Sequence, residues 1–106
     1  MKNKKSKIYR QGDVLVIPVS TIPQGLKKTK KVTLALGEVT GHHHTIHSGA
    51  VGYANDVDAL VDYLEVTEDA ADLTHQEHST IPVPKGTYQV IKQVEYTPEA
   101  IRNVQD

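Results

Sequence analysis

The sequence contains no cysteine, tryptophan or phenylalanine and a single methionine. Without cysteine the chain can form no disulfide framework, no thiolate metal site and no cysteine nucleophile. Only 38% of the residues are apolar, so leucine, isoleucine, valine and five tyrosines must supply a thin core. No apolar run approaches the ~20 residues of a membrane span. A length of 106 residues therefore predicts one small, soluble domain.

The chain begins with a basic segment. Residues 1–7 include four lysines, as the charged region of a signal peptide does, but residues 8–13, which include Arg10, Gln11 and Asp13, interrupt the pattern before any apolar run of adequate length. We therefore predict that residues 1–7 are a flexible basic N-terminus of a single domain spanning 1–106. We also predict a cytoplasmic protein that does not enter a membrane.

Charge is distributed unevenly along the chain. Nine of the twelve Lys and Arg residues lie in positions 1–31 beside one acid, Asp13, whereas positions 56–77 hold eight acids and no Lys or Arg. Such a separation can give a basic face that attracts phosphate groups. Solvation of exposed strands explains the same pattern. Because the lysines have no interleaved aromatic residues, nucleic acid is kept only as an alternative partner.

Short apolar runs separated by turn residues indicate strands. Predicted strands cover residues 14–19, 32–36, 50–55, 60–66 and 87–96, and predicted turns cover residues 23–25, 48–49, 68–72 and 82–86. Pro18 indicates an edge or a bulge in the first strand. Residues 57–66 also fit helical spacing, and residues 98–104 could form a short C-terminal helix with Pro98 in its first turn. The pattern predicts a mostly β fold, a small antiparallel barrel or sandwich.

All six histidines occur in two short segments, residues 42–47 and 75–78. If the strand at 32–36 continues through residues 38–40, His42 and His44 point to one side and His43 to the other. Three or four imidazoles, with or without the Glu77 carboxylate, suit Zn, Fe, Mn or Ni. A metal with three protein ligands keeps a position for water, which becomes a nucleophile near neutral pH. The predicted metal ligands are His42, His44, His78 and His75.

Histidines in a glycine-flanked loop can also be exposed polar residues without a shared role. However, the two segments contain every histidine of the chain. We therefore favour one shared functional site over scattered surface residues.

Several segments resemble a group of small uncharacterised bacterial and phage proteins. They are residues 10–15, 37–44, 77–78, 81–88 and 93–96, so the resemblance runs from Tyr9 to Tyr96. It implies His42, His44 and His78 as the core set and His75 as a fourth member, with His43 and His47 outside it. It also implies a bacterial or phage-infected cell, and it brings no established activity.

Two further resemblances concern the histidines. One is a similarity to the motifs of the cupin barrel, carried by Gly37, His42, His44 and residues 84–86. Residues 48–49 stand where a cupin has its glutamate, and no histidine follows Gly86, so His78 would have to be the third ligand.

The segments 43–46 and 78–81 both fit the pattern His-x-Thr-apolar, which resembles the paired motifs of the two-histidine phosphoesterases. That resemblance implies acid–base chemistry without a metal. Position 44 departs from the pattern because it is histidine rather than apolar. The spacing of the two segments is also shorter than that fold requires.

Three functions follow as hypotheses. The first is a metal-dependent hydrolase acting on a phosphodiester or nucleotide, with His75 or Glu77 as fourth ligand or general base and Tyr88 or Tyr96 orienting the substrate. The second is a metal-free phosphodiesterase that uses His43 or His44 with His78. The third is a non-enzymatic protein that sequesters a nucleotide or a host protein. The predicted catalytic residues are His78, His75, Glu77 and Tyr88, and a homo-oligomer is an expected assembly for a strand-rich chain of this size.

Overall fold

The computed structural model describes residues 7–36 and 41–92, which form eight β-strands. They are β1 (Tyr9–Gln11), β2 (Val14–Pro18), β3 (Lys27–Lys28), β4 (Val32–Leu36), β5 (His43–Ile46), β6 (Ala50–Ala54), β7 (Tyr63–Thr74) and β8 (Ile81–Lys92). In this part of the chain, no helix is long and apolar enough to cross a membrane.

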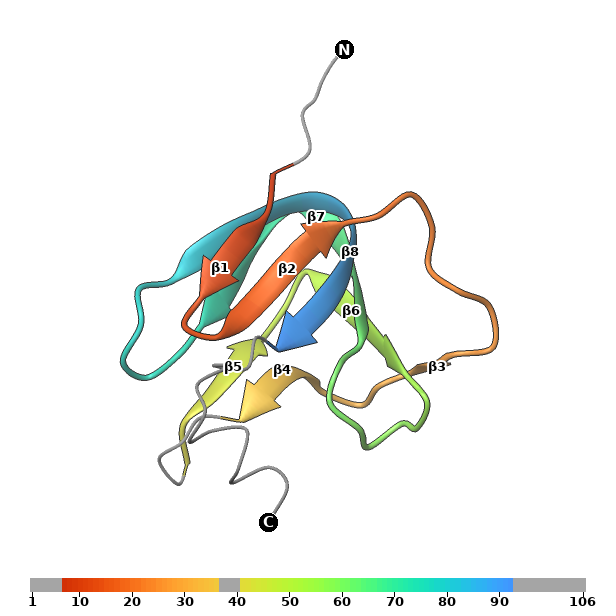
Figure 1. Cartoon of the computed structure of the whole chain (residues 1–106), viewed down its shortest axis with the longest axis horizontal. Coiled ribbons are helices and arrows are strands. Elements are labelled where there is room, and N and C mark those ends of the chain that lie inside the picture. The colour runs from red at the N-terminus through yellow and green to blue at the C-terminus, as the bar shows by residue number, and fades with distance from the viewer. Residues whose placement is uncertain (1–6, 37–40, 93–106) are drawn as a thin grey trace, which may run out of the picture.

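The strands form one antiparallel sheet with the order β1-β2-β8-β7-β5-β4. β3 lies off this path and pairs with β6, which pairs in turn with β7. The sheet curls into a half-barrel (Figure 1). The predicted mostly β, small antiparallel fold is therefore confirmed.

The β7–β8 hairpin is the longest unit of the sheet. Its pairing runs from Tyr63 opposite Gln89 to Leu73 opposite Ile81, with a shift in register between Val66 and Ala70. Within this bulge the backbone N–H groups of residues 67 and 68 both donate to the carbonyl of residue 49, at 2.9 and 3.3 Å. A bulge bends and twists the strand that carries it, which helps the sheet to curl.

Two predicted turns are wrong. Residues 68–72 lie inside β7, because pairing with β8 overrides the poor strand propensity of their Asp, Glu and Ala residues. Residues 82–86 lie inside β8. There Pro82 and Pro84 face Asp72 and Ala70 on one side, while β2 pairs only with residues 88–92. Pro82 and Pro84 have no N–H, but the side of β8 away from β7 has no partner strand at these residues in the described part of the chain. Their missing N–H groups therefore cost no hydrogen bond of the sheet.

Other predictions agree with the structure. β2, β4 and β6 coincide with the predicted strands at 14–19, 32–36 and 50–55, and a glycine with positive φ stands in each of the turns at 23–25 and 48–49. The strand predicted at 60–66 begins later, at Tyr63, and the helical alternative for 57–66 is wrong. The predicted helix at 98–104 and the strand residues beyond 92 lie outside the described residues.

The core lies inside the curl of the sheet and is aliphatic except for one tyrosine. Strand alternation places its members on one face, but β4 departs from strict alternation. A bulge between Thr33 and Ala35 buries Leu34 and Ala35 together and leaves Leu36 68% exposed. The core residues are Val14, Val16, Leu34, Ala35, Ile46, Val61, Leu64, Val66, Ala71, Leu73, Val83, Tyr88 and Val90.

Candidate functional site

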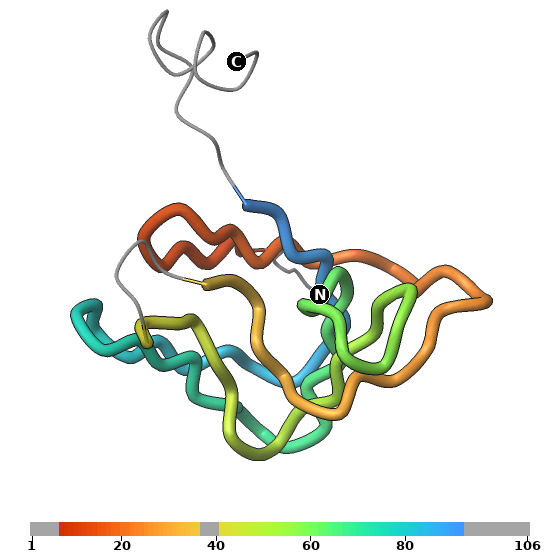
Figure 2. Tube along the Cα trace, turned by 90° about the horizontal axis from the view of Figure 1, so that it is seen from below, coloured from red at the N-terminus to blue at the C-terminus, as the bar shows by residue number. Residues whose placement is uncertain are grey.

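The sheet topology brings the two histidine segments together. β5 pairs antiparallel with β7, with Thr45 opposite Thr74. The residue before Thr45 and the residue after Thr74 therefore lie at the same end of this pair. These residues are His44 and His75, and His75 opens the loop of residues 75–80 between β7 and β8. Figure 2 shows the start of β5 beside this loop and the β1–β2 turn nearby.

The route to this arrangement differs from the predicted one. Leu36 of β4 pairs antiparallel with His43 of β5, so the chain reverses between them and His44 does not continue the β4 strand. Residues 38–40, which were predicted to extend that strand, lie outside the described residues. His42 and His44 nevertheless face the same side, since both rings contact the ring of His75.

Four imidazole rings pack against one another to form what we call the histidine cluster, His42, His44, His75 and His78. The ring centroid of His75 lies 4.4 Å from that of His44, 4.6 Å from that of His78 and 5.5 Å from that of His42. The rings of His44 and His78 are nearly parallel, with centroids 5.8 Å apart. His75 is thus the centre of the cluster.

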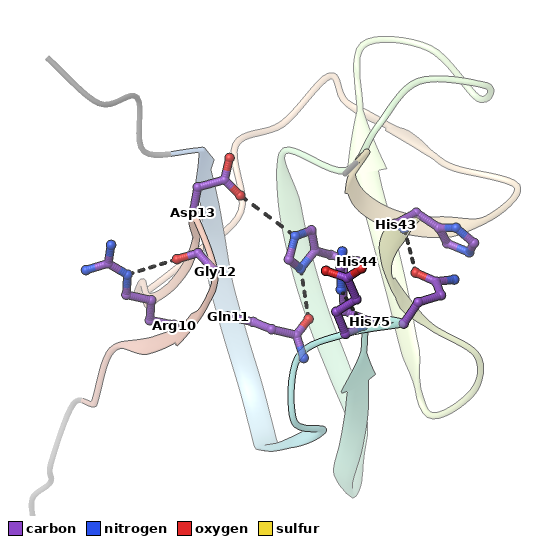
Figure 3. A network of polar contacts seen from close by, with 9 residues as sticks. Arg10, Gln11, Gly12, Asp13, His43, His44 and His75 are labelled. Carbon is purple, nitrogen blue, oxygen red and sulfur yellow. Dashed lines mark hydrogen bonds and ion pairs between the residues drawn. The ribbon is translucent and has the colours of Figure 1, made fainter. Parts of the chain in front are cut away.

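A buried glutamine fixes the ring of His44. Gln11 and His44 are each 2% exposed, and Nδ1 of His44 lies 2.9 Å from Oε1 of Gln11. The Gln11 amide nitrogen donates to two backbone carbonyls, those of Leu73 at 2.9 Å and Ser79 at 2.8 Å. Because carbonyl oxygens only accept, the amide orientation is determined and its oxygen must face His44. Gln11 therefore joins β1 to His44 of β5 (Figure 3) and also to β7 and the loop that follows it.

The same contact determines the tautomer of His44. An oxygen acceptor at Nδ1 requires that Nδ1 carries the hydrogen, so the neutral ring has its lone pair on Nε2. Burial and the neighbouring His75 lower the pKa of His44 from 6.5 to about 4, although Asp13 acts in the opposite direction. His44 is therefore a neutral imidazole at pH 7, with an available lone pair on Nε2.

The β1–β2 turn faces that lone pair. The carboxylate Oδ1 of Asp13 lies 3.7 Å from Nε2 of His44, which is too long for a direct hydrogen bond. Gly12 has φ of +60°, and a Cβ atom there would lie 2.8 Å from Nε2 of His78 and 3.4 Å from Cε1 of His44. The missing side chain of Gly12 thus lets the β1–β2 turn pack closely against both rings.

The other side of the cluster carries Glu77. Its carboxylate lies 3.6 Å from Nδ1 of His42, and its backbone N–H donates to Nδ1 of His75 at 3.0 Å. Nδ1 of His75 is therefore an acceptor, and the neutral ring carries its hydrogen on Nε2. Burial and the neighbouring His78 and His42 lower the pKa of His75. His44 and His75 thus present opposite tautomers.

The cluster matches a metal site in ring spacing but not in the aim of its ligand atoms. Imidazoles that bind one tetrahedral metal through nitrogens ~2.0–2.1 Å away have ring centroids roughly 5 Å apart, close to the spacings here. In residues 7–36 and 41–92, however, no three His, Asp or Glu side chains are oriented to hold a metal ion as they stand. Metal binding would require side-chain rotation.

His43, an alternative catalytic residue, and Tyr88, a predicted one, lie apart from the cluster, as does His47, which was predicted to stay outside it. Nδ1 of His43 contacts the carbonyl of Gly41 at 3.1 Å, and its backbone N–H donates to Gln76. His47 is exposed and lines a surface hollow beside the β7 bulge. Tyr88 is buried in the core, where its hydroxyl donates to the carbonyl of Pro84 and burial raises its pKa. This position gives Tyr88 a packing role, and Tyr96 lies outside the described residues.

Sequence patterns assigned no site role to Gln11, Gly12 or Asp13. More than sixty residues separate Gln11 from its acceptor in Leu73, so no local spacing connects them. The available signal was the segment 10–13, which is part of the resemblance to uncharacterised proteins and is polar, so it was not needed to fill the core. The structure turns this segment into one wall of the candidate site.

Residues 10–93 match the model of a family described as a domain of unknown function, DUF8820. The chain belongs to this family. The match extends from the β1–β2 hairpin to β8, so the DUF8820 region includes the whole histidine cluster together with Gln11 and Asp13. No curated protein and no solved structure matches the chain. Membership of an uncharacterised family is therefore confirmed, while the phage setting and the cupin likeness stay predictions.

Proposed function

We propose that the histidine cluster is a divalent transition-metal site of a metal-dependent hydrolase, with His44, His78 and Asp13, which lie around the Gly12 turn, as the first ligands. One observation carries the proposal. The lone pair of the buried His44 faces the Asp13 carboxylate across 3.7 Å, with the His78 ring beside it. Two imidazoles and one carboxylate form a common ligand set for zinc and for non-haem iron.

The rotation that this site needs concerns exposed side chains. His44 is held by Gln11, but His78 is exposed and the Asp13 side chain is 61% exposed. Such side chains change rotamer within nanoseconds at little cost. His75 and His42 stand beside them as further nitrogen donors, as predicted from the sequence, but His75 must first release the N–H of Glu77.

The protonation state of His44 favours a metal over a proton. A metal binds the neutral imidazole, and a ring with a pKa of about 4 is already neutral at pH 7. Its Nε2 therefore does not have to lose a proton before it binds. The same property makes His44 a weak general base, because a base works best with a pKa near the working pH. The lowered pKa of His44 thus supports the metal-dependent reaction better than the metal-free one.

The metal-free alternative uses His43 or His44 with His78. The ring of His43 contacts the carbonyl of Gly41 instead of His78. The ring of His44 does lie beside that of His78, with centroids 5.8 Å apart, but its lowered pKa makes His44 a weak general base. The Thr45 hydroxyl donates to that of Thr33 at 3.3 Å. The pair His44 and His78 thus keeps the metal-free reaction as the second candidate, behind the metal-dependent one.

A bound metal would supply a hydroxide-like water and polarise the scissile group. We propose a phosphodiester or nucleotide as substrate, but with a smaller basic surface than the sequence suggested. Arg10, whose Nε donates to the carbonyl of Gly12, is a cation of the β1–β2 hairpin and lies across this turn from His44 (Figure 3). Lys27 and Lys28 belong to β3, at the opposite end of the sheet in Figure 1, so they cannot contribute there.

The test begins with protein purified without an affinity tag. Metal content is measured by mass spectrometry, and hydrolysis of bis(p-nitrophenyl) phosphate is measured before and after removal and return of Zn²⁺, Mn²⁺ or Fe²⁺. We expect about one metal ion per chain and metal-dependent turnover. His44→Ala and His78→Ala should lose both, whereas His47→Ala, which removes an exposed histidine outside the cluster, should keep both.

Each alternative has its own outcome. Turnover by protein that retains no metal would support the metal-free phosphodiesterase. Stoichiometric metal without turnover on any ester or nucleotide would leave a metal-binding protein that is not a hydrolase. A protein with neither property but with tight nucleotide binding would be a sequestering protein.

A further inference from the structure

Gln11 is a polar residue of β1 that lies in the interior of the half-barrel. It is 2% exposed, and its three observed side-chain hydrogen bonds go to β5, to β7 and to the loop that carries His75 and His78. Two of them, to the carbonyls of Leu73 and Ser79, only hold the amide. The third uses the amide oxygen as the acceptor for Nδ1–H of His44.

The third bond decides where the His44 lone pair points. A neutral imidazole can carry its hydrogen on either nitrogen, and the partner of one nitrogen determines the state of the other. An acceptor at Nδ1 leaves Nε2 unprotonated and directed at the Asp13 side of the cluster. Without that acceptor, Nε2 could carry the hydrogen and would then present a donor to an incoming cation.

We propose that Gln11 is the positioning residue of the metal site, because its amide oxygen holds His44 as the Nδ1–H tautomer. This proposal rests on the proposed function for its consequence but not for its geometry. Carboxylates and carbonyls that hold the second nitrogen of a ligating histidine typically change metal affinity 10- to 100-fold. Gln11 has the same relation to His44.

The chain offers a matched control in Gln76. This second glutamine also accepts a hydrogen bond next to the cluster, but from the backbone N–H of His43 at 2.9 Å. It is exposed, and no contact joins it to the ring of His44 in the described structure. Substitution at Gln76 therefore tests the loss of a nearby glutamine without the loss of the tautomer.

The first experiment needs no substitution. In metal-free, tag-free protein at pH 7, nitrogen-15 NMR of the histidine rings distinguishes a protonated from an unprotonated nitrogen. We expect Nδ1 of His44 to carry the hydrogen and Nε2 to be bare. A His44 ring with its hydrogen on Nε2 would overturn the proposal, whatever the protein does with metals.

Two variants then separate positioning from packing. Gln11→Met and Gln11→Glu both lose the N–H donors to Leu73 and Ser79, so both should be less stable. Only Gln11→Glu keeps an acceptor for Nδ1–H. We expect the Nδ1–H tautomer in Gln11→Glu, a shift toward the Nε2–H tautomer in Gln11→Met, and no change in Gln76→Met.

Zn²⁺ titration of the same proteins measures the consequence. We expect the dissociation constant for Zn²⁺ to be 10- to 100-fold larger in Gln11→Met and unchanged in Gln76→Met. Equal affinity in wild type and Gln11→Met, with the tautomer changed, would overturn the positioning role. If wild type binds no metal while His44 is the Nδ1–H tautomer, the proposed function fails and the tautomer assignment stands.

Discussion

His44 and His47 are three residues apart at one strand of the sheet, yet their surroundings differ completely. His44 is buried, bonded to Gln11 and packed against two other rings. His47 is exposed beside a surface hollow of about 380 Å³, where Glu68 and Asp72 also lie. The difference comes from what the fold brings to each position, since the local sequence is histidine-rich at both.

The cluster around His44 is assembled from three elements that are distant in sequence. The β1–β2 turn contributes Gly12 and Asp13, β5 contributes His44, and the β7–β8 loop contributes His75 and His78. The hollow beside His47 is formed by only two neighbouring segments, the turn before β6 and the bulged part of β7. Convergence of independent elements is what distinguishes the candidate site from an ordinary surface depression.

Removal of the buried ring should have the largest effect on stability. His44→Ala leaves a cavity and an unpaired Gln11 oxygen, so we expect a loss of about 2–4 kcal/mol in the free energy of unfolding. His47→Ala should change it by less than about 0.5 kcal/mol because its side chain is exposed. Urea denaturation of both variants measures the difference. Equal effects would contradict the burial and bonding assigned to His44.

The pH dependence of stability sharpens the comparison. Because folding lowers the pKa of His44 from 6.5 to about 4, the unfolded chain binds its proton first as the pH falls. The stability of metal-free protein should therefore decline between pH 6.5 and pH 4 and level off below that window. The full shift corresponds to about 3 kcal/mol, and solvent screening at the open side of the cluster reduces this to roughly 1–2 kcal/mol.

Denaturant titrations at half-unit pH steps check this window. His44→Gln removes the titrating group and should flatten the decline, whereas His47→Gln should leave the wild-type curve. A decline of equal size in both variants would assign the effect to other groups.

The close packing at Gly12 gives the next prediction. Gly12→Ala forces a side chain onto a backbone with φ of +60° and places its Cβ 2.8 Å from Nε2 of His78. We expect a loss of about 1–2 kcal/mol in stability, since left-handed backbone is strained for alanine. Metal affinity should fall about tenfold as well because the His78 ring must move. Gly25→Ala, also at positive φ but with no atom within 4 Å, is the control that should lose stability alone.

The smallest expected effect concerns charge near the site. Arg10→Ala should raise KM for a phosphodiester severalfold, because this cation belongs to the β1–β2 hairpin that also carries Asp13, and should change stability by less than about 0.5 kcal/mol. Lys28→Ala should change neither, because Lys28 pairs with Tyr53 of β6 in a distant part of the sheet. Steady-state kinetics on both variants checks this, and a larger effect from Lys28→Ala would place the substrate elsewhere.

The sequence predicted those parts of the fold that depend on local pattern. The apolar run of β2, the position of β4 and the glycine turn before β6 each occur where expected, although a bulge breaks the alternation of β4. Residues 68–72 and 82–86 were predicted as turns, because Glu, Asp and Ala are poor strand formers and Pro and Gly favour turns. They became strands only through pairing in the β7–β8 hairpin. Long-range pairing of this kind cannot be predicted from a short stretch of sequence.

The candidate site divides in the same way. The two histidine segments could be singled out from composition, and the pairing of β5 with β7 brings them together. Gln11 and Asp13 could not be assigned a role, since each acts through a residue about thirty positions away in the sequence. The tautomer of His44, on which the chemistry depends, follows from three hydrogen bonds of one glutamine and from nothing near His44 in the chain.

One measurement tests the metal site most directly. Metal-free, tag-free wild type, His44→Ala and His47→Ala are titrated with Zn²⁺ by calorimetry at pH 7. We predict one binding site per chain in wild type and in His47→Ala, and no comparable site in His44→Ala. Binding of equal strength in wild type and His44→Ala, or no binding in wild type, would contradict a metal site built on the buried ring of His44.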